Sequence, residues 1–208
     1  MLLKPILMGA GIAVAVALSA CTTGGAFRTF SSGYGGLTDA GYRIPPVPIY
    51  KVDRKYLRQI VPYEETDELP GTIIVDTGAK FLYYLLGDGK AMRYGIGVGK
   101  AGFEWHGTAH VALKHAWPDW RPPAEMIVRE RKKGRIIPVH MVGGLKNPLG
   151  ARALYLFNKG GDTGYRLHGS PEWWTIGTAV SAGCIRLMNQ DIIDLYNRTE
   201  IGAKVIVI

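Results

Sequence analysis

Glycine and proline recur so often in this chain that long helices have little room. The 208 residues include 28 glycines and 12 prolines, spread along the sequence. Such punctuation favours short strands joined by turns. Strand-like apolar runs separated by turn residues fit this reading, and they fall at 72–76, 80–85, 90–98, 107–115, 136–141, 152–158, 164–168 and 203–208. We therefore expect a mainly β fold with mixed strands.

One segment has the signature of a helix, at residues 189–198. Ile192, Ile193 and Tyr196 follow each other at three- and four-residue spacing, which places them on one helix face. Asp191 falls in the first turn and Gly202 lies beyond the end, as expected for helix boundaries. The sequence therefore predicts a short helix near the C-terminus.

The first twenty residues read as an export signal. Lys4 precedes an apolar run at 6–20, which is shorter than the roughly 20 residues of a spanning helix. Residues 18–21 (Leu-Ser-Ala-Cys) resemble a bacterial lipobox, in which the chain is cut before the cysteine and the cysteine is acylated. We expect residues 1–20 to be a lipoprotein-type signal peptide and Cys21 to carry lipid. A plain signal peptide or an uncleaved anchor is the alternative.

The rest of the chain divides by composition. Residues 21–48 are rich in Gly, Ser, Thr and Pro, which predicts a flexible tether. Residues 49–69 are a linker or a packed extension. Residues 70–208 are long enough for one domain with its own core.

The formal net charge of +8 raises the question of a nucleic-acid partner. The basic residues are dispersed, and the dense cluster at 129–135 has no interleaved aromatic residues on which bases could stack. An exported protein also rarely meets nucleic acid. We expect no nucleic-acid partner and interpret the cluster as a solvated charged loop.

Chemistry concentrates around His168 and Cys184. A thiol attacks well only when a base or a positive field draws off its proton, and His168 is the candidate base. The two residues are 16 positions apart, so they meet only if the intervening segment folds back. With Cys21 acylated, Cys184 is left unpaired in an oxidising compartment, which favours chemistry over a disulfide. A small buried cysteine and a satisfied histidine are the structural alternatives.

The pattern His168-Gly169, then Ser181-x-Gly183-Cys184-x-Arg186, resembles the signature of the L,D-transpeptidase catalytic domain family, the YkuD type. Segments 117–123 and 147–156 also resemble that family, so the likeness covers roughly residues 69–208. One position departs from the pattern: many members have a second histidine where this chain has Ala182. Any role of that histidine is therefore not carried over.

The resemblance implies an L,D-transpeptidase-type β-sandwich with a short helix after the cysteine. It implies a periplasmic enzyme in which Cys184 forms a thioester with a peptidoglycan stem peptide and His168 moves protons. The product is a cross-link between two diamino acids; tethering of an outer-membrane protein to the wall and hydrolysis (L,D-carboxypeptidase activity) are alternatives. A noncatalytic wall-binding lipoprotein is a further alternative.

Supporting roles fall to neighbours of the two catalytic candidates. Gly183 and Cys184 amides are candidate oxyanion donors, and Gly169, Ser170 or Ser181 could hold the His168 ring. Arg186 either fixes a substrate carboxylate or forms a structural ion pair.

Aromatic residues and metals complete the expectations. Tyr165 and Trp173 are candidate cleft walls, with a place in the core as the alternative. His140, His168 and Cys184 lack a convincing fourth zinc ligand. We therefore expect no metal and no cofactor.

Overall fold

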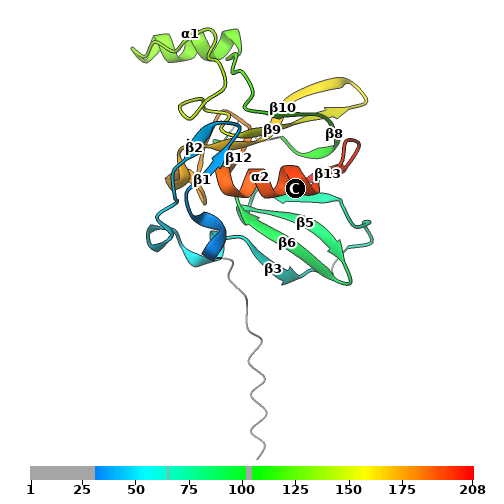
Figure 1. Cartoon of the computed structure of the whole chain (residues 1–208). Helices are drawn as coiled ribbons and strands as arrows, with labels where there is room; N and C mark the ends of the chain where they lie inside the picture. The colour runs from blue at the N-terminus through cyan, green and yellow to red at the C-terminus, as the bar shows by residue number, and fades with distance from the viewer. Residues whose placement is uncertain (1–30, 65, 102–104) are drawn as a thin grey trace, which may run out of the picture.

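The computed structural model describes residues 31–64, 66–101 and 105–208, and its centre is one nine-stranded mixed sheet (Figure 1). The strand order is β12-β10-β9-β8-β13-β4-β5-β6-β3. The mainly β prediction is confirmed. The strands are β3 Gln59–Pro62, β4 Ile73–Asp76, β5 Phe81–Gly87, β6 Lys90–Gly95, β8 Gly107–Ala116, β9 Arg152–Asn158, β10 Gly161–Ser170, β12 Ile185–Met188 and β13 Lys204–Val207.

The two layers of the fold are the two halves of this sheet. The main core cluster joins Leu82 and Tyr94 from β5 and β6 with Leu154 and Leu167 from β9 and β10. Helix α2, Asn189–Arg198, has the bounds that the sequence predicts, and its Ile192 enters the same cluster. Figure 1 shows α2 lying across the molecule between the β8–β10 half and the β3–β6 half.

Parallel pairing occurs at two places in the large sheet, between β12 and β10 and between β13 and β4. The other neighbours are antiparallel. A parallel pair requires a crossover connection. The link from β10 to β12 contains η4 Trp173–Thr175 and β11 Ala179–Ser181, and β11 pairs in parallel with β7 Val98–Gly99. The segment between His168 and Cys184 is therefore a crossover.

The predicted flexible tether at 21–48 is wrong for residues 31–48, where the chain is folded. Residues 31–62, which we call the strap, form η1 Ser31–Tyr34, β1 Leu37–Asp39, β2 Tyr42–Ile44, η2 Ile49–Lys51, η3 Arg54–Tyr56 and β3. Tyr34, Ile44 and Val47 are buried, and Arg152 binds Asp39 through two nitrogens at 2.7 and 2.8 Å. A few buried side chains and the Asp39–Arg152 ion pair thus hold this segment in a folded state, although its overall composition is typical of a linker. Residues 21–30 and the signal segment 1–20 lie outside the described residues.

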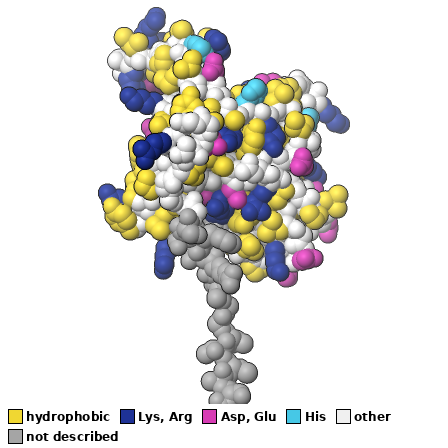
Figure 2. All heavy atoms as spheres, in the orientation of Figure 1, with side chains coloured by type: hydrophobic (Ala, Val, Ile, Leu, Met, Phe, Trp, Pro, Cys, Tyr) yellow, Lys and Arg dark blue, Asp and Glu magenta, His cyan; other side chains and the backbone are white. Residues whose placement is uncertain are grey.

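A lobe projects from the body between β8 and β9 (Figure 1). It contains α1, Ala124–Lys132, where the sequence predicted a charged loop, and no residue of α1 is buried. The predicted strand at 136–141 is wrong, because Met141 forms only an isolated bridge with Trp120. Basic and hydrophobic side chains cover the lobe in Figure 2. None of the described helices is long and apolar enough to cross a membrane.

Candidate active site

The register of β10 and β12 brings the two catalytic candidates together. His168 pairs with Arg186 and Leu167 pairs with Ile185, so Cys184, directly before β12, lies opposite Arg166. Side chains of partners and of every second residue share one face of a sheet. Because Cys184 directly precedes β12, this alternation places it on the same face as His168, diagonally across the parallel pair.

His168 is held as a neutral base. Its side chain is buried, with 4% exposed, and its Nδ1 lies 2.6 Å from the Gly169 carbonyl oxygen. A carbonyl only accepts, so Nδ1 carries the proton and Nε2 keeps its lone pair. Burial lowers the pKa of His168 to about 4, and the nearby Arg186 and Arg166 charges act in the same direction, against the Gly169 hydrogen bond. At pH 7 the ring is neutral and able to accept a proton.

Cys184 is a protonated thiol at rest. It forms no disulfide with any other described residue. Burial raises the pKa of the Cys184 thiol, while a hydrogen bond from the Arg166 backbone and the charges of Arg166 and Arg186 act against that rise. The thiol and the imidazole therefore start as a neutral pair. A thiol in this state needs a nearby base to accept its proton before it can act as a nucleophile.

The turn before Cys184 is fixed by Ser181. The Ser181 hydroxyl donates to the Cys184 carbonyl oxygen at 2.6 Å and accepts from the Gly183 amide at 3.1 Å. Gly183 has φ +122, a conformation that side chains other than hydrogen disfavour. The serine thus acts as a support for the turn. The Gly183 amide already donates to Ser181, so it could bind an oxyanion only after breaking that hydrogen bond.

Arg186 forms an ion pair that sequence analysis left as an alternative. Its guanidinium lies 2.8 Å from Glu172 Oε2, with 19% of the arginine side chain and 47% of the glutamate side chain exposed. Its Nε is buried and has no hydrogen-bond partner among the described residues. Arg186 is therefore anchored at one end and keeps an unused donor.

The two aromatic candidates lie in packed surroundings. Tyr165 alternates with His168 to the other face of β10, where its ring stacks on Trp105 with 5.5 Å between centroids and packs against the main core. Trp173 packs against a second cluster formed with the strap. Trp174 is the more open ring, with 60% exposed. These placements favour the core alternative for Tyr165 and Trp173.

Three residues near the site were not singled out from the sequence. Arg166 contributes its backbone and its charge to Cys184, and Glu172 anchors Arg186. Asn189 is buried at the start of α2 and accepts a hydrogen bond from the Ala151 amide at 2.9 Å. The sequence marked Asn189 only as the start of the predicted helix, and no described side chain forms a capping bond there. The other two depend on strand register, which the motif does not encode.

The described residues were considered as metal ligands because His140, His168 and Cys184 are potential zinc ligands. No group of three His, Cys, Asp or Glu side chains within the described ranges could hold a metal ion. His140, considered above as a zinc ligand, lies 2.8 Å from Asp119 Oδ2, on the projecting lobe side of the molecule.

Comparison with known proteins decides the family. A sequence model of the YkuD L,D-transpeptidase catalytic domain matches residues 70–207. The chain belongs to the L,D-transpeptidase family. The resemblance noted in the sequence is thereby confirmed.

Named relatives of this L,D-transpeptidase agree with the match. "Probable L,D-transpeptidase YbiS" of Escherichia coli is 33% identical over 139 residues, which are 65% of this chain and 43% of that protein. "Probable L,D-transpeptidase YcfS" of Escherichia coli is 35% identical over 141 residues, 66% of this chain and 43% of that protein. The chain thus spans less than half the length of these two relatives.

A solved structure is also similar. A crystallised protein from Brucella melitensis, named a probable carnitine operon oxidoreductase, is 44% identical with a TM-score of 0.50. The alignment covers 77% of this L,D-transpeptidase chain and 99% of that protein. The similarity therefore extends over more of the chain than the matched catalytic region.

Proposed function

We propose that this L,D-transpeptidase uses Cys184 as its nucleophile and His168 as its general base, acting on peptidoglycan stem peptides. The observation that carries the proposal is the pairing of β10 with β12, which sets a neutral, buried imidazole diagonally beside a protonated thiol. Both groups are in the protonation state that the first chemical step requires at pH 7.

In the acylation step, Cys184 Sγ attacks the carbonyl carbon of the third, diamino-acid residue of a donor tetrapeptide. The thiol proton passes to His168 Nε2, and the carbonyl oxygen becomes an oxyanion. The intermediate then collapses: the bond to the terminal D-alanine breaks, and the imidazolium gives its proton to the leaving amine. The products are a thioester on Cys184, free D-alanine and neutral His168, so protons balance.

In the second step an amine attacks the thioester. His168 takes the amine proton and returns it to the departing Cys184 sulfur. A diamino-acid amine of a second stem peptide yields a cross-link, a lysine of an outer-membrane protein yields a protein tethered to the wall, and water yields hydrolysis. Cross-linking is our principal proposal, following the resemblance noted in the sequence.

Arg186 and the Cys184 amide supply the electrostatic part of the site. An oxyanion needs preorganised donors in a site with little water. The Cys184 amide lies beside the sulfur, and the Gly183 amide joins it if Ser181 releases its hydrogen bond. The partly exposed guanidinium of Arg186, paired with Glu172, adds positive charge near a substrate carboxylate or carbonyl.

We also propose that the protein acts in the periplasm, attached to a membrane by a lipid on Cys21. The support is the apolar run at 6–20 followed by the lipobox-like residues 18–21. Because the strap begins at residue 31, nine residues, 22–30, lie between Cys21 and the folded part of the chain. The domain is thereby kept close to the membrane surface.

The test is covalent labelling followed by product analysis. The full chain is incubated with a donor tetrapeptide that ends in a diamino acid and D-alanine, and intact mass is measured. We expect one tripeptide acyl mass on Cys184, none in Cys184→Ala, and normal labelling in the control Cys21→Ser. An acyl mass that persists in Cys184→Ala would contradict the proposal.

The acceptor is identified on isolated cell walls. Muropeptides from cells with and without the protein are compared by mass spectrometry. Cross-links between two diamino acids support the principal proposal. Loss of the terminal D-alanine alone would overturn cross-linking in favour of hydrolysis. Protein-derived remnants on the wall would overturn it in favour of protein tethering.

A further inference from the structure

The strap contacts the catalytic region although it lies outside the matched residues 70–207. Its last strand, β3, extends the edge of the large sheet by pairing with β6. Its remaining part runs along the left side of the molecule in Figure 1, beside β12 and the start of α2. The segments that flank Cys184 are therefore its neighbours.

The segment before Cys184 rests on Tyr56. The Tyr56 ring belongs to a cluster that includes Leu57 of the strap together with Ile176 and Met188. Gly177 has φ +86, and a Cβ built on it would lie 2.4 Å from the Tyr56 ring. The ring thus lies close against the Gly177 backbone, where a side chain at this position would collide with it.

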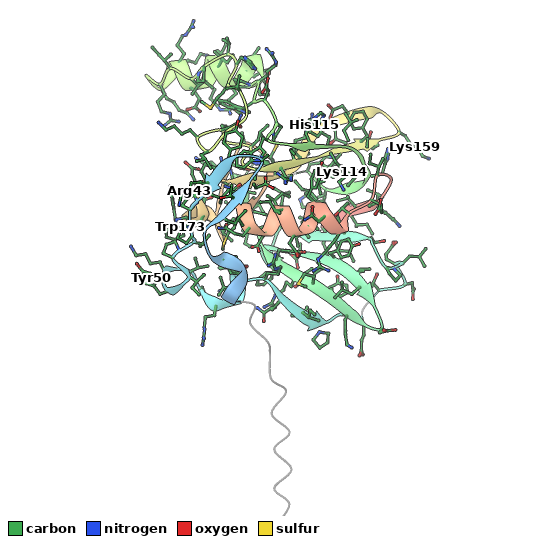
Figure 3. All side chains as sticks on the ribbon, viewed as in Figure 1. Arg43, Tyr50, Lys114, His115, Lys159 and Trp173 are labelled. Carbon is green, nitrogen blue, oxygen red and sulfur yellow. The ribbon has the colours of Figure 1, made fainter. Side chains whose placement is uncertain are left out.

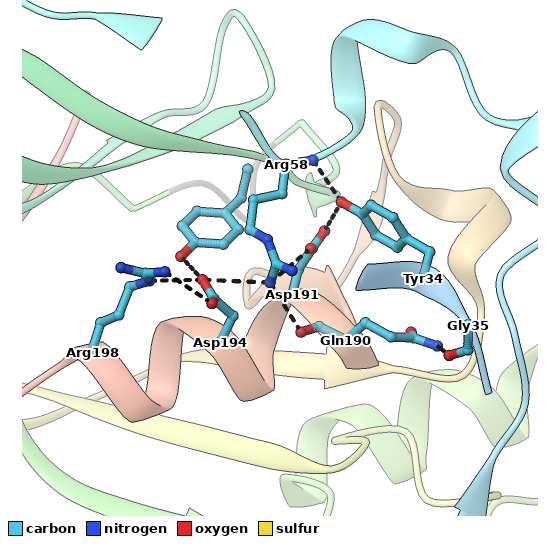
Figure 4. A network of polar contacts seen from close by, with 8 residues as sticks. Tyr34, Gly35, Arg58, Gln190, Asp191, Asp194 and Arg198 are labelled. Carbon is cyan, nitrogen blue, oxygen red and sulfur yellow. Dashed lines mark hydrogen bonds and ion pairs between the residues drawn. The ribbon is translucent and has the colours of Figure 1, made fainter. Parts of the chain in front are cut away.

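The segment after Cys184 rests on Tyr34 and Arg58 (Figure 4). The Tyr34 hydroxyl donates to Asp191 Oδ2 at 3.1 Å, and the Arg58 amide donates to the Tyr34 oxygen at 2.5 Å. The Arg58 guanidinium lies 3.7 Å from Asp191 and 3.4 Å from Asp194. Asp191 is fully buried in the first turn of α2, so these contacts fix where β12 passes into the helix.

The loop that Tyr56 covers is also joined to the β6–β7 segment through its backbone: the Gly177 amide donates to the Ile96 carbonyl at 2.9 Å, and the Val98 amide donates to the Thr178 carbonyl at 3.0 Å. Its only strand, β11, is three residues long and pairs with the two-residue strand β7. Thr178, Ala179 and Val180 are exposed residues of this loop. A loop with few buried contacts opens more readily than the sheet that carries it.

We propose that the strap is a clamp that positions Cys184 relative to His168, with Tyr56 as its positioning residue. Tyr56 acts through Gly177 and the crossover loop, and it does not touch the reacting atoms. The proposal rests on the proposed function in that it takes Cys184 as the nucleophile. Small misplacements matter here, because a displacement of about 1 Å can lower the rate of a positioned reaction on the order of 100-fold.

The test compares Tyr56→Ala with Tyr56→Phe and with the control Tyr50→Ala. Tyr50 lies in the same strap but its side chain is 83% exposed and points away from the body (Figure 3). We expect Tyr56→Ala to lower acyl transfer to the donor tetrapeptide about 10- to 100-fold. Tyr56→Phe keeps the ring and should restore the rate, and Tyr50→Ala should match the parent chain.

A second measurement follows the thiol without any peptide. The rate of Cys184 alkylation by iodoacetamide is recorded against pH in Cys21→Ser chains, with thermal unfolding measured alongside. Loosening the loop admits more water to the partly buried Cys184 thiol, so its alkylation midpoint should fall toward that of a free cysteine, about 8.5. A residue that serves stability alone lowers Tm without moving this midpoint.

The outcomes separate the clamp from the proposed function. If the folded Tyr56→Ala chain keeps both the transfer rate and the alkylation midpoint of the parent, the clamp proposal is overturned. If the parent itself transfers no acyl group, the proposed function fails while the alkylation midpoint still decides the clamp. Should Tyr56→Ala not fold, Tyr56→Leu, which retains apolar cover, decides by the same two readouts.

Discussion

Replacing His168 with asparagine should change how the stability of the protein depends on pH. The asparagine amide can donate to the Gly169 carbonyl as Nδ1 does now at 2.6 Å, but it does not titrate. Burial lowers the pKa of His168 from 6.5 to about 4 in the folded chain. The unfolded chain therefore binds a proton at a higher pH than the folded chain does.

The sign and the size follow by linkage. Stability from His168 is fully present above pH 6.5 and is lost as the pH falls through about 4, because the unfolded chain takes up the proton first. At about 1.4 kcal/mol for each pH unit, the loss is on the order of 3 kcal/mol. The parent chain should therefore lose about 3 kcal/mol more than His168→Asn between pH 7 and pH 4.

Urea unfolding at several pH values measures this difference directly. Asp191 and the other carboxyls titrate in both chains, so their effects cancel in the comparison. The same exchange at His110, whose side chain is exposed, is the matched control. A free-energy difference between parent and His168→Asn that stays constant from pH 7 to pH 4 would refute the reasoning, as would an imidazole NMR titration of His168 with a midpoint near 6.5.

Other substitutions give further predictions. Cys184→Ala should abolish labelling by an acylating β-lactam, measured by intact mass, whereas retained labelling would assign the nucleophile elsewhere. Burial raises the pKa of Asp191 to about 7, so its contribution to the free energy of unfolding is lost as the pH rises from about 4 through 7. Asp191→Asn should remove this loss, which is on the order of 4 kcal/mol and is measured by urea unfolding at several pH values. An unchanged dependence of the unfolding free energy on pH would contradict this. Arg186→Gln breaks the Glu172 pair and should raise KM for the donor more than it lowers kcat, in steady-state assays; equal effects of Glu172→Gln and Arg186→Gln would indicate a structural ion pair alone.

Local sequence signals were enough for the elements that carry the site. The apolar spacing of Ile192 and Tyr196 predicted α2 with its observed bounds, because an amphipathic period and terminal residues act within a few positions. The run at 152–158 likewise predicted β9. The motif around His168 and Cys184 indicated the two residues that strand pairing sets side by side.

Long-range contacts account for most of what the sequence did not predict. The strap folds because residues such as Tyr34 and Asp39 meet partners more than a hundred positions away, and no local pattern reports this. The role of Arg166 follows from register alone. Helix α1 is different: Glu125 in its first turn and Arg131 in its last complement the helix dipole, a local signal that the dense positive charge obscured.

The bond between Tyr34 and Asp191 also bears on the order in which the chain folds. It joins residues 157 positions apart, and contacts at such separation form late because the ends of a long loop must first be brought together. During synthesis from the N-terminus, the strap emerges before α2 and completes its contacts only after Asp191 has followed. The segments on either side of Cys184 therefore gain their contacts with the strap only after α2 has been made. A chain that stops before α2 lacks these contacts and leaves the surroundings of the Cys184 thiol incomplete.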